Sequence, residues 1–223
     1  MLALIIFDLD GVIVSTDRFH YEAWKKLSDD NGLEFNEEVN QLLRGVSRSE
    51  SLKIILEKNN RIIEAPEFNA MLEKKNRIYR DKLQDLTEAD ILPGVITLLE
   101  DINKNNLLTA VGSSSKNTPL ILKRIGLDKS FDTVVDGNSI RKSKPDPEVF
   151  IKCAQQLKTN PGDCVVYEDA AAGIEAALAA GMVAIGVGEN ELPGAHRMAK
   201  TLKSESCSKI ITTYTRVLGR GPA

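Results

Sequence analysis

The chain has 223 residues, of which 42% are hydrophobic and 27% are charged, enough for one α/β domain with an inserted second unit. Its formal net charge of −3 argues against a general nucleic-acid or membrane-surface binder, and we expect neither as a partner. The cysteines are odd in number and widely spaced, which predicts neither a disulfide framework nor a zinc site and favours a cytoplasmic protein.

The N-terminus predicts a buried strand that ends in two acids. The apolar run Leu4–Phe7 is rich in β-branched residues, and Asp8 and Asp10 follow it on the same side of an extended backbone. Gly11 then allows a sharp turn. The acid pair could simply cap a neighbouring helix, but two carboxylates this close favour a bound divalent cation. Because charges interrupt the apolar run at Asp8, we expect neither a signal peptide nor a membrane span.

A helical stretch of some eighty residues comes next and predicts an inserted all-α unit over residues 15–90, with the core formed by 1–14 and 91–223. Its expected helices run from Thr16 or Asp17 to Asn31, between Asn36 and Leu43 with an end near Gly45, from the capping box Ser47–Glu50 onward, and from Pro66 through Leu83.

Three of these helices each place one basic or titratable residue on the face that should be apolar. The residues are His20, Arg48 and Lys75. Taken singly, each has an ordinary structural explanation, because a lone histidine is commonly satisfied within a core and long basic side chains reach water. Together they favour a site for an anion, above all a phosphate.

Strand and helix patterns alternate after Pro93-Gly94. The strand Leu107–Gly112 is followed by the segment 113–117, a serine-rich loop whose hydroxyl and N–H groups could hold a phosphate. An ordinary serine cap explains this loop about equally well. A helix to Ile125 and a short strand Thr133–Val135 come next.

Lys144 and a second acid pair complete the expected site. Pro145 fixes an extended entry from which Lys144 can point back to the sheet edge, although basic runs are usually solvated. The buried strand Cys164–Tyr167 ends in Glu168 and Asp169 before a helix over 170–180. The alternation predicts an α/β fold with an open parallel Rossmann-like sheet flanked by helices. Its carboxyl edge would gather the acids, Ser113 and Lys144 into a Mg²⁺ and phosphate site.

The last thirty residues depart from this pattern. From about residue 194 the chain carries six Lys and Arg but one acid, Glu205. Only Ile210-Ile211 predicts a strand there, and Gly219–Ala223 is typical of disorder. This atypical segment is either diverged, or the product of an altered reading frame or an artificial end, and it puts the outer sheet edge in doubt.

Four ordered motifs resemble those of the haloacid dehalogenase-like phosphotransferases: Asp8-Leu9-Asp10-Gly11-Val12, Ser113 after a strand, Lys144-Pro145, and Glu168-Asp169. The resemblance covers roughly residues 1–190, and the helical insertion looks like the small cap domain of that family. Further details are similar to the β-phosphoglucomutase family: Thr16 with His20 and Trp24, Gly45-Val46-Ser47-Arg48 followed by Ser51-Leu52, Lys75-Asn76, and the segment Ser113-Ser114-Ser115-Lys116-Asn117.

The resemblance implies roles in the core. Asp8 would be the nucleophile that becomes an aspartyl phosphate, and Asp10 the general acid and base. Mg²⁺, one per chain, would be held by Asp8, the Asp10 carbonyl, Glu168 and Asp169. Ser113 and Lys144 would hold the transferring phosphoryl oxygens.

The resemblance also implies roles in the helical unit and a reaction. Thr16 lies where the cap would hinge, Arg48 would clamp the second phosphate, and Lys75 with His20 would orient the sugar or link closure to Asp10. The residues implied in substrate binding are Trp24, Arg48, Lys75, Ser114, Ser115 and Asn117. The implied enzyme is a monomer that interconverts β-glucose 1-phosphate and glucose 6-phosphate, with glucose 1,6-bisphosphate as the activating phosphoryl donor. A sugar-phosphate phosphatase is the alternative, and a non-catalytic sensor is harder to reconcile with two intact aspartates.

Overall fold

The structure is a computed structural model that describes residues 1–43 and 46–219. It divides into two compact units: unit 1 comprises Met1–Ser15 and Thr87–Ala223, and unit 2 comprises Thr16–Leu86. Within the described residues, no helix is both long enough and apolar enough to cross a membrane.

Unit 1 is built on a six-stranded parallel sheet with the strand order β3-β2-β1-β4-β5-β6. The strands are β1 (Leu4–Phe7), β2 (Leu108–Gly112), β3 (Thr133–Val135), β4 (Cys164–Glu168), β5 (Val183–Val187) and β6 (Arg197–Ala199). All four residues of β1 are buried, because this strand lies in the middle of the sheet. The predicted α/β class and open parallel sheet are confirmed.

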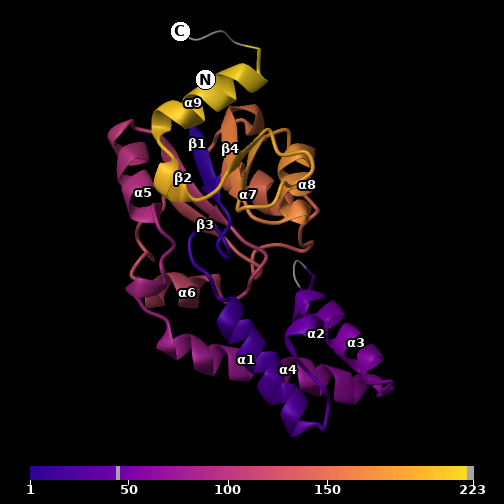
Figure 1. Cartoon of the computed structure of the whole chain (residues 1–223). Coiled ribbons are helices and arrows are strands. Elements are labelled where there is room, and N and C mark those ends of the chain that lie inside the picture. The colour runs from indigo at the N-terminus through magenta and orange to yellow at the C-terminus, as the bar shows by residue number, and fades with distance from the viewer. Residues whose placement is uncertain (44–45, 220–223) are drawn as a thin grey trace. The chain divides into compact units, whose positions relative to one another are not determined.

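Helices cover both faces of this sheet (Figure 1). They are α5 (Val95–Lys104), α6 (Thr118–Arg124), α7 (Glu148–Gln156), α8 (Ala171–Ala179) and α9 (Cys207–Val217). Side chains of α7 and α8 form one apolar core with Leu4, Ile6 and Val166. On the other face, the ring of Phe7 stacks on Tyr167, with ring centroids 5.4 Å apart.

The register of the sheet brings the ends of its central strands to one level. Phe7 pairs with Val111 on β2 and with Tyr167 on β4, and Gly112 pairs with Val135 on β3. The residues that follow these partners therefore emerge together at the carboxyl edge of the sheet, where open α/β sheets bind ligands.

The described residues of unit 2 form the α-helices α1 (Asp17–Asp30), α2 (Glu37–Gln41), α3 (Arg48–Lys58) and α4 (Ala65–Lys82), followed by a 3-10 helix, Leu83–Asp85. Their apolar faces pack into a separate core. The predicted helices are all present, and Ser47 caps α3 by accepting a hydrogen bond from the Glu50 N–H at 3.2 Å. The predicted helix end near Gly45 lies outside the described residues.

The C-terminal segment forms a helix, so the prediction of a strand at Ile210-Ile211 is wrong. Both isoleucines lie in α9, where Ile210 is buried and Ile211 is exposed, as expected for successive positions on an amphipathic helix. The outer sheet edge is also intact, because β6 pairs with β5 in parallel. Gly219 forms the turn that ends α9, and residues 220–223 lie outside the described ranges.

Candidate active site

The end of β1 places the first acid pair at the carboxyl edge of the sheet. Asp8 is buried, and its N–H donates to the Tyr167 carbonyl at 2.9 Å, which fixes its backbone beside β4. Asp10 is half-buried, and the chain around it turns back so that the Gly11 N–H donates to the Val14 carbonyl at 2.8 Å. Gly11 adopts φ 79°, which favours glycine.

The end of β4 brings two further carboxylates to Asp8. Ligand oxygens of Asp8, Glu168 and Asp169 all lie within 4.8 Å of one another. Two glycines make this cluster sterically possible: a Cβ on Gly11 would come within 2.0 Å of Asp169 Oδ2, and a Cβ on Gly173 would come within 2.0 Å of Glu168 Cδ. Hard divalent cations such as Mg²⁺ prefer this kind of donor set, so the residues present fit such an ion.

Lys144 lies against the same carboxylates. Its Nζ donates to Asp8 Oδ1 and, at 2.7 Å, to Glu168 Oε2, and its side chain is 10% exposed. The ammonium also lies 4.7 Å from the centre of the Phe150 ring. The two carboxylates hold the Lys144 ammonium at the carboxyl edge of the sheet, where it can bind an anionic ligand.

The pKa values of the acids and of Lys144 are shifted because these charged groups are buried close together. Burial, together with the neighbouring carboxylate of Asp8, raises the pKa of Glu168 to about 7 and that of Asp169 to about 8, although the charge of Lys144 opposes both shifts. Asp169 is exposed as a residue, yet its carboxylate lies against Gly11 and among the other acids, including Asp10. Burial alone would lower the pKa of Lys144, but Asp8 and Glu168 outweigh it and raise that pKa. A bound divalent cation would favour the charged carboxylates.

The segment 113–117 forms a compact loop after β2. Ser113 is buried, and its Oγ accepts from the Ser115 N–H at 3.1 Å, while Ser115 Oγ accepts from the Asn117 N–H at 3.2 Å. The Lys144 N–H donates to Ser114 Oγ at 3.4 Å, so this loop adjoins the lysine. Asn117 N-caps α6 by its backbone and is buried.

Unit 2 contains its own polar cluster around Lys75. This lysine is 1% exposed, and its Nζ lies 2.8 Å from His20 Nδ1, 4.9 Å from the Trp24 ring centre and 4.6 Å from the Tyr79 ring centre. The Tyr79 hydroxyl donates to Thr16 Oγ1 at 3.0 Å.

The cluster fixes the protonation of His20. An ammonium is a donor only, so His20 Nδ1 accepts and the neutral ring carries its proton on Nε2. Burial lowers the pKa of His20 well below its usual value, and the charges of Lys75 and Arg48 lower it further. Arg48 itself is half-buried, and burial lowers its pKa. The structure thus brings Thr16, His20, Trp24 and Lys75 into one cluster.

Three contributors were not foreseen. Gly173 leaves room for the Glu168 carboxylate, and the Phe150 ring contacts Lys144; both contacts depend on tertiary packing. Tyr79 is the third, although its spacing of four residues from Lys75 places both on one face of a helix and was a usable signal.

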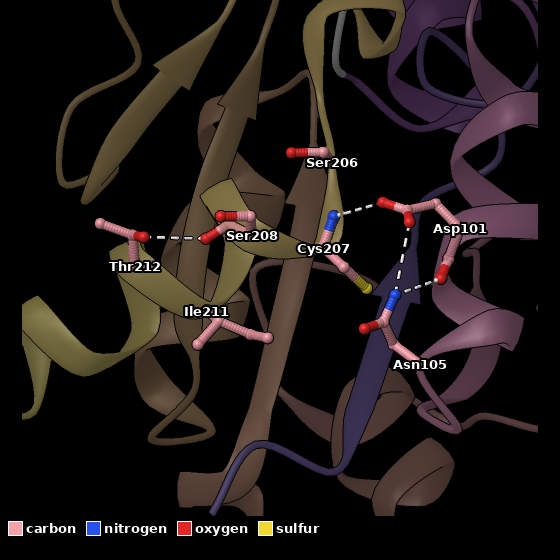
Figure 2. Close-up of a pocket in the computed structure, with 7 residues that line it drawn as sticks. All are labelled: Asp101, Asn105, Ser206, Cys207, Ser208, Ile211 and Thr212. Atoms are coloured by element: carbon pink, nitrogen blue, oxygen red, sulfur yellow. Dashed lines mark hydrogen bonds between the residues drawn. The ribbon is translucent and has the colours of Figure 1, made fainter. Parts of the chain in front are cut away.

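Two hollows of unit 1 lie away from the acids and Lys144. One of about 440 Å³ lies between α5 and α9 and is lined by Asp101, Asn105 and residues from Ser206 to Thr212 (Figure 2). Another of about 520 Å³ is lined by residues from Glu88 to Thr97 and from Ile125 to Leu127. Neither lining, as far as the described residues go, includes the acids or Lys144, so the chemistry of the sheet edge identifies the site better than the size of a hollow.

The parallel sheet, with acids and Lys144 at its carboxyl edge, indicates the class of protein. A sequence model of the haloacid dehalogenase-like hydrolase family matches residues 5–187, and the chain belongs to that family. It is an enzyme of this family by its fold and its relatives.

Particular relatives include mutases and phosphatases. The chain is 40% identical over 191 residues to a β-phosphoglucomutase of Bacillus subtilis, covering 84% of each chain. It is 33% identical over 183 residues to a fructose-1-phosphate phosphatase of Escherichia coli, covering 82% of this chain and 95% of that one. The crystal structure of β-phosphoglucomutase from Clostridium difficile superposes with a TM-score of 0.89 at 37% identity, covering 99% of this chain and 100% of the other.

Proposed function

We propose that the protein is a β-phosphoglucomutase, an isomerase that interconverts β-glucose 1-phosphate and glucose 6-phosphate through an aspartyl phosphate and β-glucose 1,6-bisphosphate. The observation that carries the proposal is the positive charge of unit 2: Lys75 and Arg48, beside the neutral His20, accompany a cluster of acids and Lys144 in unit 1. A reaction with a bisphosphate intermediate needs two anion sites, whereas hydrolysis of a monophosphate needs one. The identity to the Bacillus subtilis mutase supports the same reading.

In this proposal the core residues carry out the transfer. An Asp8 oxygen attacks phosphorus, the bond from phosphorus to the sugar oxygen breaks, and Asp10 gives its proton to that oxygen. In the return step Asp10 takes the proton of the attacking sugar hydroxyl. Lys144 and Ser113 contact the oxygens of the transferring group and neutralise its charge.

Asp8, Glu168, Asp169 and the Asp10 carbonyl would hold one Mg²⁺, which supplies positive charge to the phosphoryl oxygens. Glucose 1,6-bisphosphate would prime Asp8 with its first phosphoryl group. The donor set of Asp8, Glu168 and Asp169 supports this assignment.

Unit 2 would act as the cap domain. Arg48 would bind the phosphate that is not being transferred. Ser114, Ser115 and Asn117 of unit 1 would bind substrate. Trp24, Lys75 and His20 would bind the sugar, and Thr16 would lie at the hinge. A closing cap keeps water from the phosphoaspartate, which a mutase needs more than a phosphatase does. We propose that the enzyme works as a cytoplasmic monomer, and its three free cysteines fit a reducing compartment.

The deciding experiment measures two products at once. Purified protein is given Mg²⁺, β-glucose 1-phosphate and a trace of glucose 1,6-bisphosphate, while glucose 6-phosphate is followed with a coupled dehydrogenase and free phosphate is counted. Glucose 6-phosphate that forms only with the bisphosphate, with little phosphate release, is the expected result. Phosphate release equal to sugar consumption would contradict the mutase.

A sugar-phosphate phosphatase is the second candidate, because the Escherichia coli fructose-1-phosphate phosphatase and a phosphorylated-carbohydrate phosphatase of Thermotoga maritima are 33% and 31% identical to the chain. Replacing Arg48 with Ala separates the two: a mutase should lose most of its bisphosphate-dependent turnover, and a phosphatase should lose little. Arg77→Ala is the matched control, since Arg77 is an exposed arginine of the same unit.

A further inference from the structure

The turn that follows β3 touches the loop 113–117 at several points. Asn138 Nδ2 donates to the Lys116 carbonyl at 3.0 Å and to Asp136 Oδ2 at 2.9 Å. An amide nitrogen has two hydrogens, so these two bonds use both and hold the Asn138 side chain in one orientation.

Asp136 holds Asn138 in place. Its carboxylate is buried, and Oδ1 accepts from the Asn138 N–H at 2.9 Å and from the Ser139 hydroxyl at 3.2 Å. Asp136 therefore ties both the backbone and the side chain of Asn138 to the end of β3, the strand beside β2 in the sheet.

Gly137 brings the two backbones together. Its N–H donates to the Ser115 carbonyl at 3.1 Å, and a Cβ at this position would come within 2.3 Å of the Ser114 carbonyl oxygen and 2.9 Å of the Lys116 nitrogen. The close approach therefore requires glycine. Successive residues of the loop, Ser114 to Lys116, are held by the turn.

We infer that Asp136, Gly137 and Asn138 are positioning residues for the phosphate-binding loop 113–117. The inference rests on the proposed function in one respect, namely that this loop binds a phosphate of the substrate. Asn138 is exposed, so the loss of its side chain costs the fold little, and its effect falls on the placement of Ser114, Ser115 and Asn117. The carboxylates that would hold Mg²⁺ lie at the ends of β1 and β4, so we expect them to keep their geometry.

The test compares Asn138→Ala with Asn105→Ala. Asn105 is a matched control, because this exposed asparagine also donates to a backbone carbonyl and a carboxylate, both of Asp101, in the hollow between α5 and α9 (Figure 2). The measurements are the dissociation constant of inorganic phosphate with Mg²⁺ present, the Mg²⁺ affinity, the KM and kcat for β-glucose 1-phosphate, and hydrogen exchange in the peptide 113–118.

For Asn138→Ala we expect phosphate binding about 10-fold weaker, a KM raised by a similar factor, faster exchange in 113–118 and an unchanged Mg²⁺ affinity. Asn138→Asp keeps the size, removes the donors and adds charge beside Asp136, so it should be at least as defective. Gly137→Ala should be worse still, because its methyl group displaces the Ser114 carbonyl.

Two results would overturn the inference. One is an Asn138→Ala protein whose phosphate affinity and loop exchange match those of Asn105→Ala. The other is a parallel loss of Mg²⁺ and phosphate affinity, which would indicate general disorder of the edge. If the unaltered protein neither binds phosphate nor turns over sugar phosphate, the proposed function fails, while the exchange of 113–118 still decides the role of Asn138.

Discussion

Lys144 lies where it would assist phosphoryl transfer and would also compete with a divalent cation for the same carboxylates. Its ammonium binds Asp8 and Glu168, two of the three carboxylates that would hold a divalent cation. In the proposed phosphoryl-transfer site it would neutralise the transferring group, whereas in the free protein it neutralises the carboxylates themselves. The two effects have opposite signs and can be separated by one substitution.

We expect Lys144→Met to lower turnover by about 10²–10³-fold, because positive charge beside the transferring phosphoryl group is lost. The same change should tighten Mg²⁺ binding, since no ammonium competes for the carboxylates. Calorimetric titration with Mg²⁺ and steady-state kinetics measure the two quantities. Lys142→Met is the control, because Lys142 is an exposed neighbour in the same loop. Weaker Mg²⁺ binding in Lys144→Met would refute the competition.

The raised pKa values of Glu168 and Asp169, about 7 and about 8, predict a pH dependence of stability. Their protonated forms are favoured in the folded, metal-free protein, whereas the unfolded chain ionises them near their ordinary values of about 4. The free energy of unfolding should therefore fall as pH rises from about 4 to about 8. Chemical denaturation at several pH values, with EDTA present, measures this loss.

Mg²⁺ should restore the free energy of unfolding that is lost as pH rises. Binding requires the charged carboxylates, so the Mg²⁺ dissociation constant should fall between pH 6 and pH 9, and the stabilisation by Mg²⁺ should grow over the same range. Asp169→Asn should flatten both pH profiles. An affinity for Mg²⁺ that is independent of pH would show that the carboxylates are already ionised.

At the scale of elements, a buried ion pair joins the C-terminal segment to β4. Arg197 on β6 binds Glu205 through two nitrogens, one of them 2.9 Å from Glu205 Oε1, and the Tyr167 hydroxyl donates to Glu205 Oε2 at 2.6 Å. Burial would raise the pKa of Glu205, but its bonds to Arg197 and Tyr167 outweigh burial and lower it. The Glu205 side chain is 1% exposed.

Removing Glu205 would leave Arg197 and the Tyr167 hydroxyl without their partner, and removing the Tyr167 hydroxyl would leave Glu205 with one bond fewer. We expect Glu205→Ala to lower the free energy of unfolding by about 3 kcal/mol, and Tyr167→Phe by about 1 kcal/mol. Urea denaturation measures both, and the double variant should cost less than the sum because the two side chains share one bond. Strict additivity would show that Tyr167 and Glu205 do not act together.

The same elements show what the sequence can and cannot predict. Asp8, Glu168 and Ser113 were predictable because each follows a buried strand, and the parallel topology then places them at one edge. The C-terminal strand was not, since β6 is an edge strand whose Arg197 is satisfied by a distant Glu205. Likewise, nothing in the local pattern of Asp136-Gly137-Asn138 shows which loop it will contact, because the pairing of β2 with β3 decides that.

At the scale of the whole molecule, the described residues include an apolar core in each unit. One consists of the sheet with α7 and α8, and the other of residues of unit 2 such as Trp24, Leu52 and Ile55. Each core is formed within its own unit, so each unit can lose its packing separately. The proposed mutase would need both units, whereas the carboxylates that would bind Mg²⁺ all lie in unit 1.

Leu52→Ala tests this division. Leu52 is fully buried in unit 2, and its truncation should cost about 2–5 kcal/mol, a large part of the stability of a unit of about 70 residues. Hydrogen exchange should therefore rise throughout unit 2, and mutase turnover should collapse, while Mg²⁺ affinity stays close to that of the unaltered protein.

Leu98→Ala is the reciprocal variant, because Leu98 is buried in α5 of unit 1. It should raise exchange in the sheet and weaken Mg²⁺ binding while unit 2 keeps its protection. If both variants instead raised exchange evenly along the chain, the two units would unfold as one cooperative body. In that case the loss of turnover in Leu52→Ala could not be attributed to the helical unit, and Arg48→Ala would remain the sharper test of what that unit contributes.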